Sequence, residues 1–218
     1  MSWTLNNLPL IGELALVHVR HSVVPLLLAF VLSLPLGWLA WRFTAVRGLI
    51  VSGTGLLYTI PSLALLFVLP TLLGISALSE VNLIIALTLY GLALLVRAVV
   101  DGLDSVDAET RLAANAMGYG PLRRLIAVDF PLAGPVILAG VRVASVSTIA
   151  LATVGILVGV SNLGYLFTNG FQRRIVEEIL AGLGAVALIA VVVDLLLVTA
   201  GRLLLPWTRL TAAKGASA

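Results

Sequence analysis

The sequence lacks cysteine and has few charged and few aromatic side chains. Its 218 residues include 0 cysteines, 11% charged residues and 6% aromatic residues. Without cysteine, the chain offers no disulfide, no thiolate metal site and no cysteine nucleophile. Soluble domains are about 25% charged, so this small charged fraction cannot cover a water-facing surface. An ordinary soluble enzyme, a disordered chain and a fibrous repeat are therefore excluded.

Apolar residues, by contrast, are abundant. They make up 61% of the chain, and the mean hydropathy is +1.15. A membrane-spanning helix needs about 20 mostly apolar residues. Five stretches meet this requirement: residues 22–41, 49–73, 81–100, 135–159 and 183–205. We therefore predict an all-α polytopic membrane protein with five transmembrane helices, the second of them broken by Pro61 and Pro70.

The flanking segments complete the expected domain organisation. Residues 1–21 are expected to form an N-terminal interfacial segment, 22–205 the transmembrane domain and 206–218 a cytoplasmic tail. His18 and His21 are expected at the membrane interface rather than in a catalytic site. An odd number of spans excludes an inverted repeat of equal halves within the chain. A second chain is therefore expected to complete any transport pathway.

The basic residues predict the orientation in the membrane. The net charge of +3 comes from residues scattered around apolar blocks, which argues against a nucleic-acid partner and is typical of topology signals in a membrane protein. With the N-terminus outside, the outer segments hold only Arg20, Arg173 and Arg174. The C-terminus then lies in the cytoplasm, and the inner segments hold Arg42, Arg47, Arg97, Arg111, Arg123, Arg124, Arg202, Arg209 and Lys214.

Residues 101–134 form a long polar segment between two predicted spans, on the cytoplasmic side. Asp107 or Ser105 is suited to cap a helix over residues 108–117. Gly118 and Gly120 should end that helix. Pro121 suits the first turn of another, and this second short helix is expected over residues 122–130. Pro131 and Pro135 are expected to break the chain before the next span.

Two interpretations of this segment follow from the residues. It is either an amphipathic loop held on the inner leaflet by Arg123 and Arg124, or a docking surface for a cytosolic partner.

This segment resembles the motif E-A-A-x3-G-x9-I-x-L-P of ABC-importer permeases. The matching residues, at the motif's spacing, are Leu112-Ala113-Ala114, Gly118 and Val128-Asp129-Phe130-Pro131. Leu112 replaces the motif's glutamate. Glu109, one helical turn earlier, is placed to substitute for it in part.

Further stretches resemble the permeases for glycine betaine, carnitine and choline. They are Ile60–Leu66 (IPSLALL), Pro131–Arg142 (PLAGPVILAGVR) and Ile179–Gly182 (ILAG). The resemblance implies a type I ABC-importer core made of two permease chains, identical or paralogous, within membrane lipid. It also implies two cytosolic ATPase subunits and an extracytoplasmic substrate-binding protein. Proline is a further candidate substrate.

The same resemblance implies that the loop contains a coupling helix, around Ala113 to Pro121, seated in the ATPase. The residues expected to couple are Glu109, Leu112, Ala113, Ala114, Met117, Gly118, Gly120, Pro121 and Pro131. The chain has no phosphate loop of the form G-x4-G-K-[S/T]. ATP and Mg²⁺ are therefore expected in the partner ATPase, and no cofactor in this chain.

Arg142 and Asp194 are charges placed within predicted spans. Such residues are functional candidates by default. Their depths differ by only a few ångströms at 1.5 Å per residue, and we predict a buried ion pair that joins the fourth and fifth spans. The alternatives are that Arg142 extends alone to the inner interface, or that it contacts substrate directly.

Small residues also repeat along the fourth span. Ser145, Thr148, Ala152, Gly155 and Gly159 follow at steps of 3 and 4 and should share one helix face. That face would either pack tightly against another span or line the pathway or a permease–permease seam.

The proline break in the second span gives gate candidates. Pro61 frees a backbone carbonyl about one turn earlier, and irregular backbone at membrane depth is tolerated where it lines a cavity. The candidates are Tyr58, Thr59, Pro61 and Ser62, with a simple packing kink as the alternative.

Other functions remain open at this point. No catalytic residue set and no metal-ligand spacing stands out. Few aromatic residues are available for a cage around a quaternary ammonium group, so tight substrate recognition is expected in the separate binding protein. The alternatives are a permease for another small solute, an ion-coupled secondary carrier or a membrane scaffold.

Overall fold

The computed structural model describes residues 2–207, which are mostly helical and include no strand. This part of the chain confirms the all-α prediction. The predicted tail of residues 206–218 lies outside the described residues except for Pro206 and Trp207. The helices in order are α1 (Ser2–Asn6), α2 (Leu8–Arg42), α3 (Thr44–Leu57), α4 (Ser62–Leu73), α5 (Glu80–Asp104), α6 (Ala108–Ala116), α7 (Pro121–Arg124), π-helical η1 (Leu125–Asp129), α8 (Phe130–Ala152), 3₁₀-helical η2 (Thr153–Val158), α9 (Gly164–Arg173) and α10 (Val176–Leu204).

Four helical segments of the described chain are long and apolar enough to cross a membrane by themselves. They are α2, α5, the continuous segment Pro121–Val158, and α10. The fifth predicted span consists instead of α3 and α4, which meet at 108°. The count of five therefore holds when this bent pair is taken as one broken span.

The break falls at Pro61 as predicted, but Pro70 does not break the chain. Pro61 precedes the first residue of α4 and has an extended ψ of 133°. Pro70 lies inside α4, where its missing N–H leaves the Leu66 carbonyl without its helical donor. The amide of Asn82 donates to that carbonyl at 2.9 Å, so the helix continues.

The helix α2 is longer than the predicted first span. It runs unbroken through the segment that we expected to be separately interfacial, and its 35 residues correspond to about 52 Å at 1.5 Å per residue. His18 and His21 are fully buried, not exposed at an interface, and His18 Nε2 lies 3.0 Å from the Ile149 carbonyl oxygen of α8. These polar side chains are thus covered by other helices. Their polarity therefore does not indicate a separate interfacial segment, and α2 continues through it.

The fourth predicted span also begins earlier than expected. Neither Pro131 nor Pro135 breaks the chain, and helical structure runs on from Pro121. Before Pro131 the helix is π-helical, with the Phe130 N–H donating to the Leu125 carbonyl five residues back. Pro131 occupies the first turn after this irregular stretch, and Pro135 lies within α8, as prolines do in many membrane helices.

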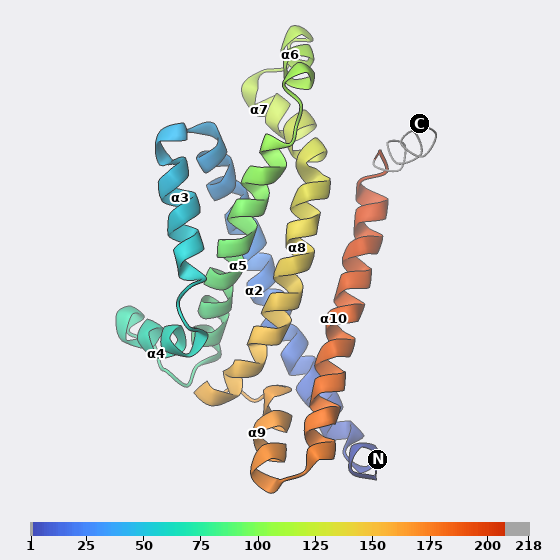
Figure 1. The fold of residues 1–218 in the computed structure, drawn as a ribbon. Coiled ribbons are helices and arrows are strands. Elements are labelled where there is room, and N and C mark those ends of the chain that lie inside the picture. The colour runs from blue at the N-terminus through green and yellow to red at the C-terminus, as the bar shows by residue number, and fades with distance from the viewer. Residues whose placement is uncertain (1, 208–218) are drawn as a thin grey trace.

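The helices α2, α5 and α8 form the centre of the protein. Figure 1 shows α3 and α4 on one side of them, α10 on the other, and α6 with α7 projecting at one end. The core between the central helices contains Leu95, Val96 and Val99 of α5, all with 0% exposure. The face of α10 that carries Leu188 and Leu195 is exposed in this single chain, as expected for a surface that meets lipid or another subunit.

Candidate functional site

The loop between α5 and α8 is the candidate site, and its first helix forms as predicted. Asp107 caps α6, since its carboxylate accepts from the Glu109 N–H at 3.2 Å. After α6, Gly118 adopts a φ of +83°. The Tyr119 N–H donates to the Ala114 carbonyl at 3.1 Å, which closes the helix end in the manner of a glycine C-cap.

The surface of this loop is unusually apolar. Leu112, Met117 and Leu122 are 67%, 71% and 69% exposed, although the loop lies at the end of the protein (Figure 1). The predicted coupling residues lie together here, apart from Pro131 in the first turn of α8. Ala114 is the one among them that is fully buried; Glu109, Ala113, Gly118, Gly120 and Pro121 are exposed.

The buried carboxylate of Asp129 connects the helices of the loop. Asp129 is 0% exposed and accepts from Arg111 Nε of α6 at 3.1 Å and from Arg124 Nε of α7 at 3.2 Å. Arg111 also donates to the Leu103 carbonyl of α5. One carboxylate therefore ties α6 and α7 to the start of α8, and Arg111 ties them to the end of α5.

Sequence reasoning did not identify this cluster. In the motif, Asp129 is only a variable position. The available clue was an acidic residue within the apolar stretch Leu125–Phe130, with two arginines upstream.

Two further contacts reinforce the loop. Arg124 donates to Asn115 Oδ1 at 3.0 Å, and the Arg111 guanidinium lies 4.9 Å from the ring centre of Trp41. One sequence interpretation assigned Arg124 to the lipid surface, but in the structure its guanidinium contacts protein groups instead. Arg123 lies over the Tyr119 ring at 4.6 Å. The loop is therefore a braced rigid unit with an apolar outer face.

The gate candidates lie together at the bend between α3 and α4. The Tyr58 ring contacts the Tyr90 ring edge-on at 5.8 Å, and the Tyr90 hydroxyl donates to the Ile60 carbonyl. The Thr59 hydroxyl, two residues after the end of α3, donates to the Leu56 carbonyl of that helix. Pro61 follows, and Ser62 begins α4. The contact with Tyr90 holds the bend against α5, and a gating role stays a prediction.

The small-residue stripe is shorter than predicted. Ser145, Thr148 and Ala152 are buried in α8, and both hydroxyls donate to carbonyls of their own helix. The α-helix ends at Ala152. Gly155 lies in the following 3₁₀ segment, and Gly159, with a φ of +76°, lies just after that segment. The five residues therefore do not share one helix face. The burial of the first three is what tight packing requires, and a pathway role for them stays a prediction.

Arg142 and Asp194 form the predicted ion pair between α8 and α10. Arg142 Nε lies 2.6 Å from Asp194 Oδ1, and Nη2 lies 2.9 Å from Oδ2, which is a bidentate arrangement. The prediction that the pair is buried is wrong for the single chain: the side chains are 44% and 30% exposed, and the pair lies at the surface of this subunit. Arg142 does not extend alone to the interface.

This pair makes a prediction for a double-mutant cycle. Arg142→Ala and Asp194→Ala should each lower the thermal stability of the purified protein, because each leaves the other charge unpaired at membrane depth. The double variant should lose much less than the sum of the two single losses. Thermal unfolding followed by size-exclusion chromatography measures all four proteins. Additive losses would show that the two side chains do not stabilise each other.

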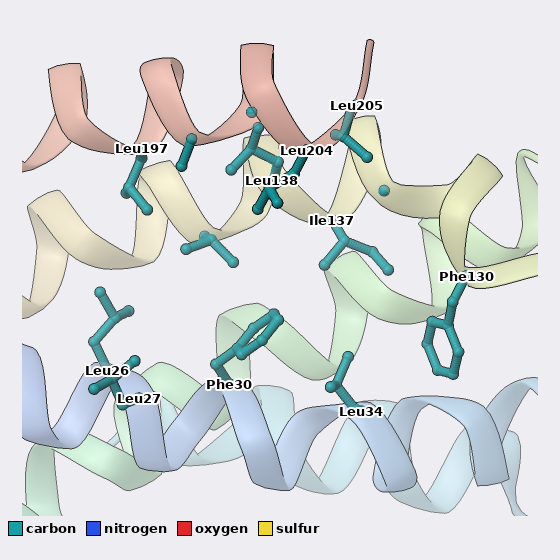
Figure 2. Close-up of a pocket in the computed structure, with 14 residues that line it drawn as sticks. Leu26, Leu27, Phe30, Leu34, Phe130, Ile137, Leu138, Leu197, Leu204 and Leu205 are labelled. Atoms are coloured by element: carbon teal, nitrogen blue, oxygen red, sulfur yellow. The ribbon is translucent and has the colours of Figure 1, made fainter. Parts of the chain in front are cut away.

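The structure also contains an apolar groove of about 450 Å³ between α2, α8 and α10. Figure 2 shows leucine and phenylalanine side chains of these helices pointing into it. No side chain that lines it can donate or accept a hydrogen bond, so it offers nothing to orient a charged solute. The lining residues are Leu26, Leu27, Phe30, Leu34, Phe130, Gly134, Ile137, Leu138, Val141, Leu197, Ala200, Gly201, Leu204 and Leu205.

These features define a class of protein. Apolar helices long enough to cross a membrane, joined by one braced loop at the end of the molecule, are the architecture of a polytopic membrane protein. Within residues 2–207 no cluster of three or more His, Asp or Glu side chains is arranged to hold a metal ion.

Comparison with known proteins identifies the family. Residues 19–210 match the family described as the binding-protein-dependent transport system inner membrane component, and the chain belongs to this family. It is therefore a permease subunit of an ABC importer, a membrane protein and not an enzyme. An ion-coupled secondary carrier and a scaffold are not favoured.

Similar proteins cover most of the chain. The choline transport system permease protein OpuBB of Bacillus subtilis is 30% identical over 87% of this chain and 86% of its own length. The glycine betaine/carnitine/choline transport system permease protein OpuCD of Bacillus subtilis is 34% identical over 83% and 78%. The osmoprotectant import permease protein OsmW of Salmonella typhimurium is 32% identical over 89% and 92%.

A solved structure has the same fold. The chain is similar to one in the MetNI methionine ABC transporter, with a TM-score of 0.72, 21% identity, and coverage of 90% of this chain and 95% of the other. At this identity the likeness supports the type I permease fold and says nothing about the solute.

Proposed function

We propose that this permease imports osmoprotectants of the glycine betaine, choline, carnitine and proline type. The observation that carries the proposal is the set of relatives named for choline, for glycine betaine, carnitine and choline, and for osmoprotectants, each at least 30% identical over more than four fifths of this chain. A permease for another small solute is the alternative.

The complex is proposed to contain two cytosolic ATPase subunits that bind ATP and Mg²⁺. The α5–α8 loop of each permease chain is proposed as the contact with an ATPase subunit. Exposed apolar side chains on an otherwise polar end are typical of a protein interface, and Leu112, Met117 and Leu122 provide them on a unit that Asp129 makes rigid. A rigid unit can transmit a rigid-body movement of the ATPases to the membrane helices.

The remaining partners and the orientation follow from the same proposal. A second permease chain, identical or paralogous, completes the pathway, and an extracytoplasmic binding protein delivers the solute. The N-terminus lies outside and the C-terminus in the cytoplasm, which is supported by the distribution of arginines between the two ends.

Uptake by the reconstituted complex tests the substrate. The permease is assembled in proteoliposomes with its ATPase, its binding protein and internal ATP, and labelled glycine betaine, choline, carnitine and proline are offered in turn. ATP-dependent accumulation of at least one of them is expected. Accumulation of none, together with intact ATP hydrolysis by the complex, would contradict the proposed substrate class.

Replacing Gly118 tests the coupling loop. The left-handed φ of +83° costs a residue with a side chain about 1–2 kcal/mol, so Gly118→Val should distort the end of α6 and reduce ATPase binding. The amount of ATPase that co-purifies with the permease measures this effect.

Gly74→Val is the matched control for Gly118→Val. Gly74 ends α4 with a φ of +66° and, like Gly118, has no neighbour within 4 Å of an added Cβ. The backbone strain is comparable, but the site lies far along the chain from the loop. We expect Gly74→Val to retain its ATPase. Normal ATPase binding by Gly118→Val would overturn the assignment of the loop.

A further inference from the structure

A second cavity, of about 320 Å³, lies between the first turns of α3 and the last turns of α5. Unlike the groove in Figure 2, it is lined by charged and hydroxyl groups. From α3 come Thr44, Gly48 and Ser52, which follow one another at helical spacing, and from α5 come Arg97 and Asp101. The α3 wall also includes Arg47 and Val51, and Val100 lies between the two charges of α5, so the cavity combines small, apolar and charged side chains.

Arg97 has no partner among residues 2–207. No hydrogen bond, ion pair or ring contact joins its guanidinium to another described side chain. By contrast, Arg47 in the same cavity pairs with Asp104, and Arg142 pairs with Asp194. Arg97 lies seven residues before the end of α5, towards the predicted cytoplasmic side, and its side chain is exposed in the single chain. Its guanidinium is therefore accessible at the cavity and has no partner within the described chain.

Asp101 lies one helical turn after Arg97 on the same face of α5. The two residues are about 6 Å apart along the helix axis, and no ion pair within 4.0 Å forms between them. The Asp101 side chain likewise accepts no hydrogen bond from a described residue. The cavity wall therefore presents Arg97 and Asp101 side by side without a direct contact between them, and Asp101 also attracts Arg47 of α3 electrostatically.

We propose that Arg97 and Asp101 form a binding site for small zwitterions that carry a carboxylate and a quaternary ammonium group, such as glycine betaine and carnitine. The planar guanidinium of Arg97 binds the carboxylate with two parallel hydrogen bonds. The quaternary ammonium has no N–H to donate, so it is attracted by charge alone, and Asp101 supplies that charge. This inference rests on the proposed osmoprotectant function.

The site predicts selectivity among those solutes. Choline carries the ammonium group but has a hydroxyl in place of the carboxylate, so it uses Asp101 and gains little from Arg97. Removing the Arg97 charge should therefore affect glycine betaine more than choline, whereas removing the Asp101 charge should affect both. A side chain needed only for folding would show no such pattern.

Saturation-transfer NMR on the N-methyl protons of each solute tests the site. The permease–ATPase complex is embedded in nanodiscs of phosphatidylethanolamine and phosphatidylglycerol, without binding protein. In Arg97→Gln the glycine betaine signal should fall about tenfold, the scale of a lost charge-assisted pair, while choline changes little. Arg97→Lys should retain part of the signal. In Asp101→Asn, a second variant in case Arg97→Gln fails to assemble, both signals should fall.

Arg20→Gln is the control variant for Arg97→Gln. Arg20→Gln removes an arginine that pairs with Glu80 and should leave both signals unchanged. No contact of glycine betaine with the unaltered complex, an unchanged signal in Arg97→Gln, or equal loss for choline would each overturn the site. An unchanged signal accompanied by loss of bound phosphatidylglycerol would assign Arg97 to lipid phosphate. Uptake without NMR contact defeats this site alone, whereas loss of uptake by the unaltered complex defeats the proposed function.

Discussion

Asp129→Ala is expected to destabilise the permease strongly and to release its ATPase. The carboxylate is fully buried and accepts from both Arg111 and Arg124. Removing one partner from a buried ion pair costs about 3–5 kcal/mol, because it leaves the other charge uncompensated. Here two guanidinium groups lose the same acceptor. We therefore expect a large loss in thermal stability and in the ATPase that co-purifies.

Two further variants sharpen this experiment. Asp129→Asn keeps one oxygen acceptor but no charge, so its loss should be intermediate. Asp104→Ala removes the same charge from the exposed ion pair with Arg47, whose side chains are 40% and 39% exposed, and exposed pairs contribute little. If Asp129→Ala were no worse than Asp104→Ala, the carboxylate would not be the brace of the loop.

Gly140→Ala is expected to force the helices α5 and α8 apart. A Cβ at position 140 would lie 2.2 Å from the Cβ of Ala98, far inside van der Waals contact. Overpacking of this kind costs about 1–3 kcal/mol and sometimes more. Because α5 and α8 carry the two ends of the coupling loop, we expect lower thermal stability and weaker ATP-dependent uptake.

Removing the Ala98 methyl group from α5 should restore the stability that Gly140→Ala loses. With Ala98→Gly, the nearest atom to the new Cβ at position 140 is the Ala98 Cα, at 3.7 Å, which is ordinary contact. The double variant Ala98→Gly/Gly140→Ala has the same composition as the unaltered protein and should recover most of its stability. Gly184→Ala, with nothing within 4 Å of the added Cβ, should have little effect on folding of the single chain. Failure of the double variant to recover would contradict the close approach.

The helices and their approximate positions could be predicted because they depend on local properties. Runs of about 20 apolar residues have few alternatives to spanning a membrane as helices. The Asp107 cap, the glycine turn at Gly118 and the break at Pro61 all follow from the backbone preferences of single residues. The pair of Arg142 and Asp194 was predictable because only a limited number of charges occur at that depth in the predicted spans.

Other features depended on partners distant in sequence. Pro70 does not end a helix because Asn82 satisfies the carbonyl that it frees, and no local pattern shows this. The polar residues His18 and His21 suggested a membrane interface, but neighbouring helices bury them. The prolines before α8 suggested a break, but a π-helical turn accommodates the first of them.

The sequence by itself determined the class of fold, the number of spans and the place of the loop, because hydropathy and backbone preference act within one stretch of chain. Only the tertiary structure decided which charges meet. Asp129 lies between two arginines, and Arg97 lacks any side-chain partner in the described chain; the neighbouring sequence indicates neither arrangement. Electrostatic contacts depend on distances between helices, and packing sets those distances.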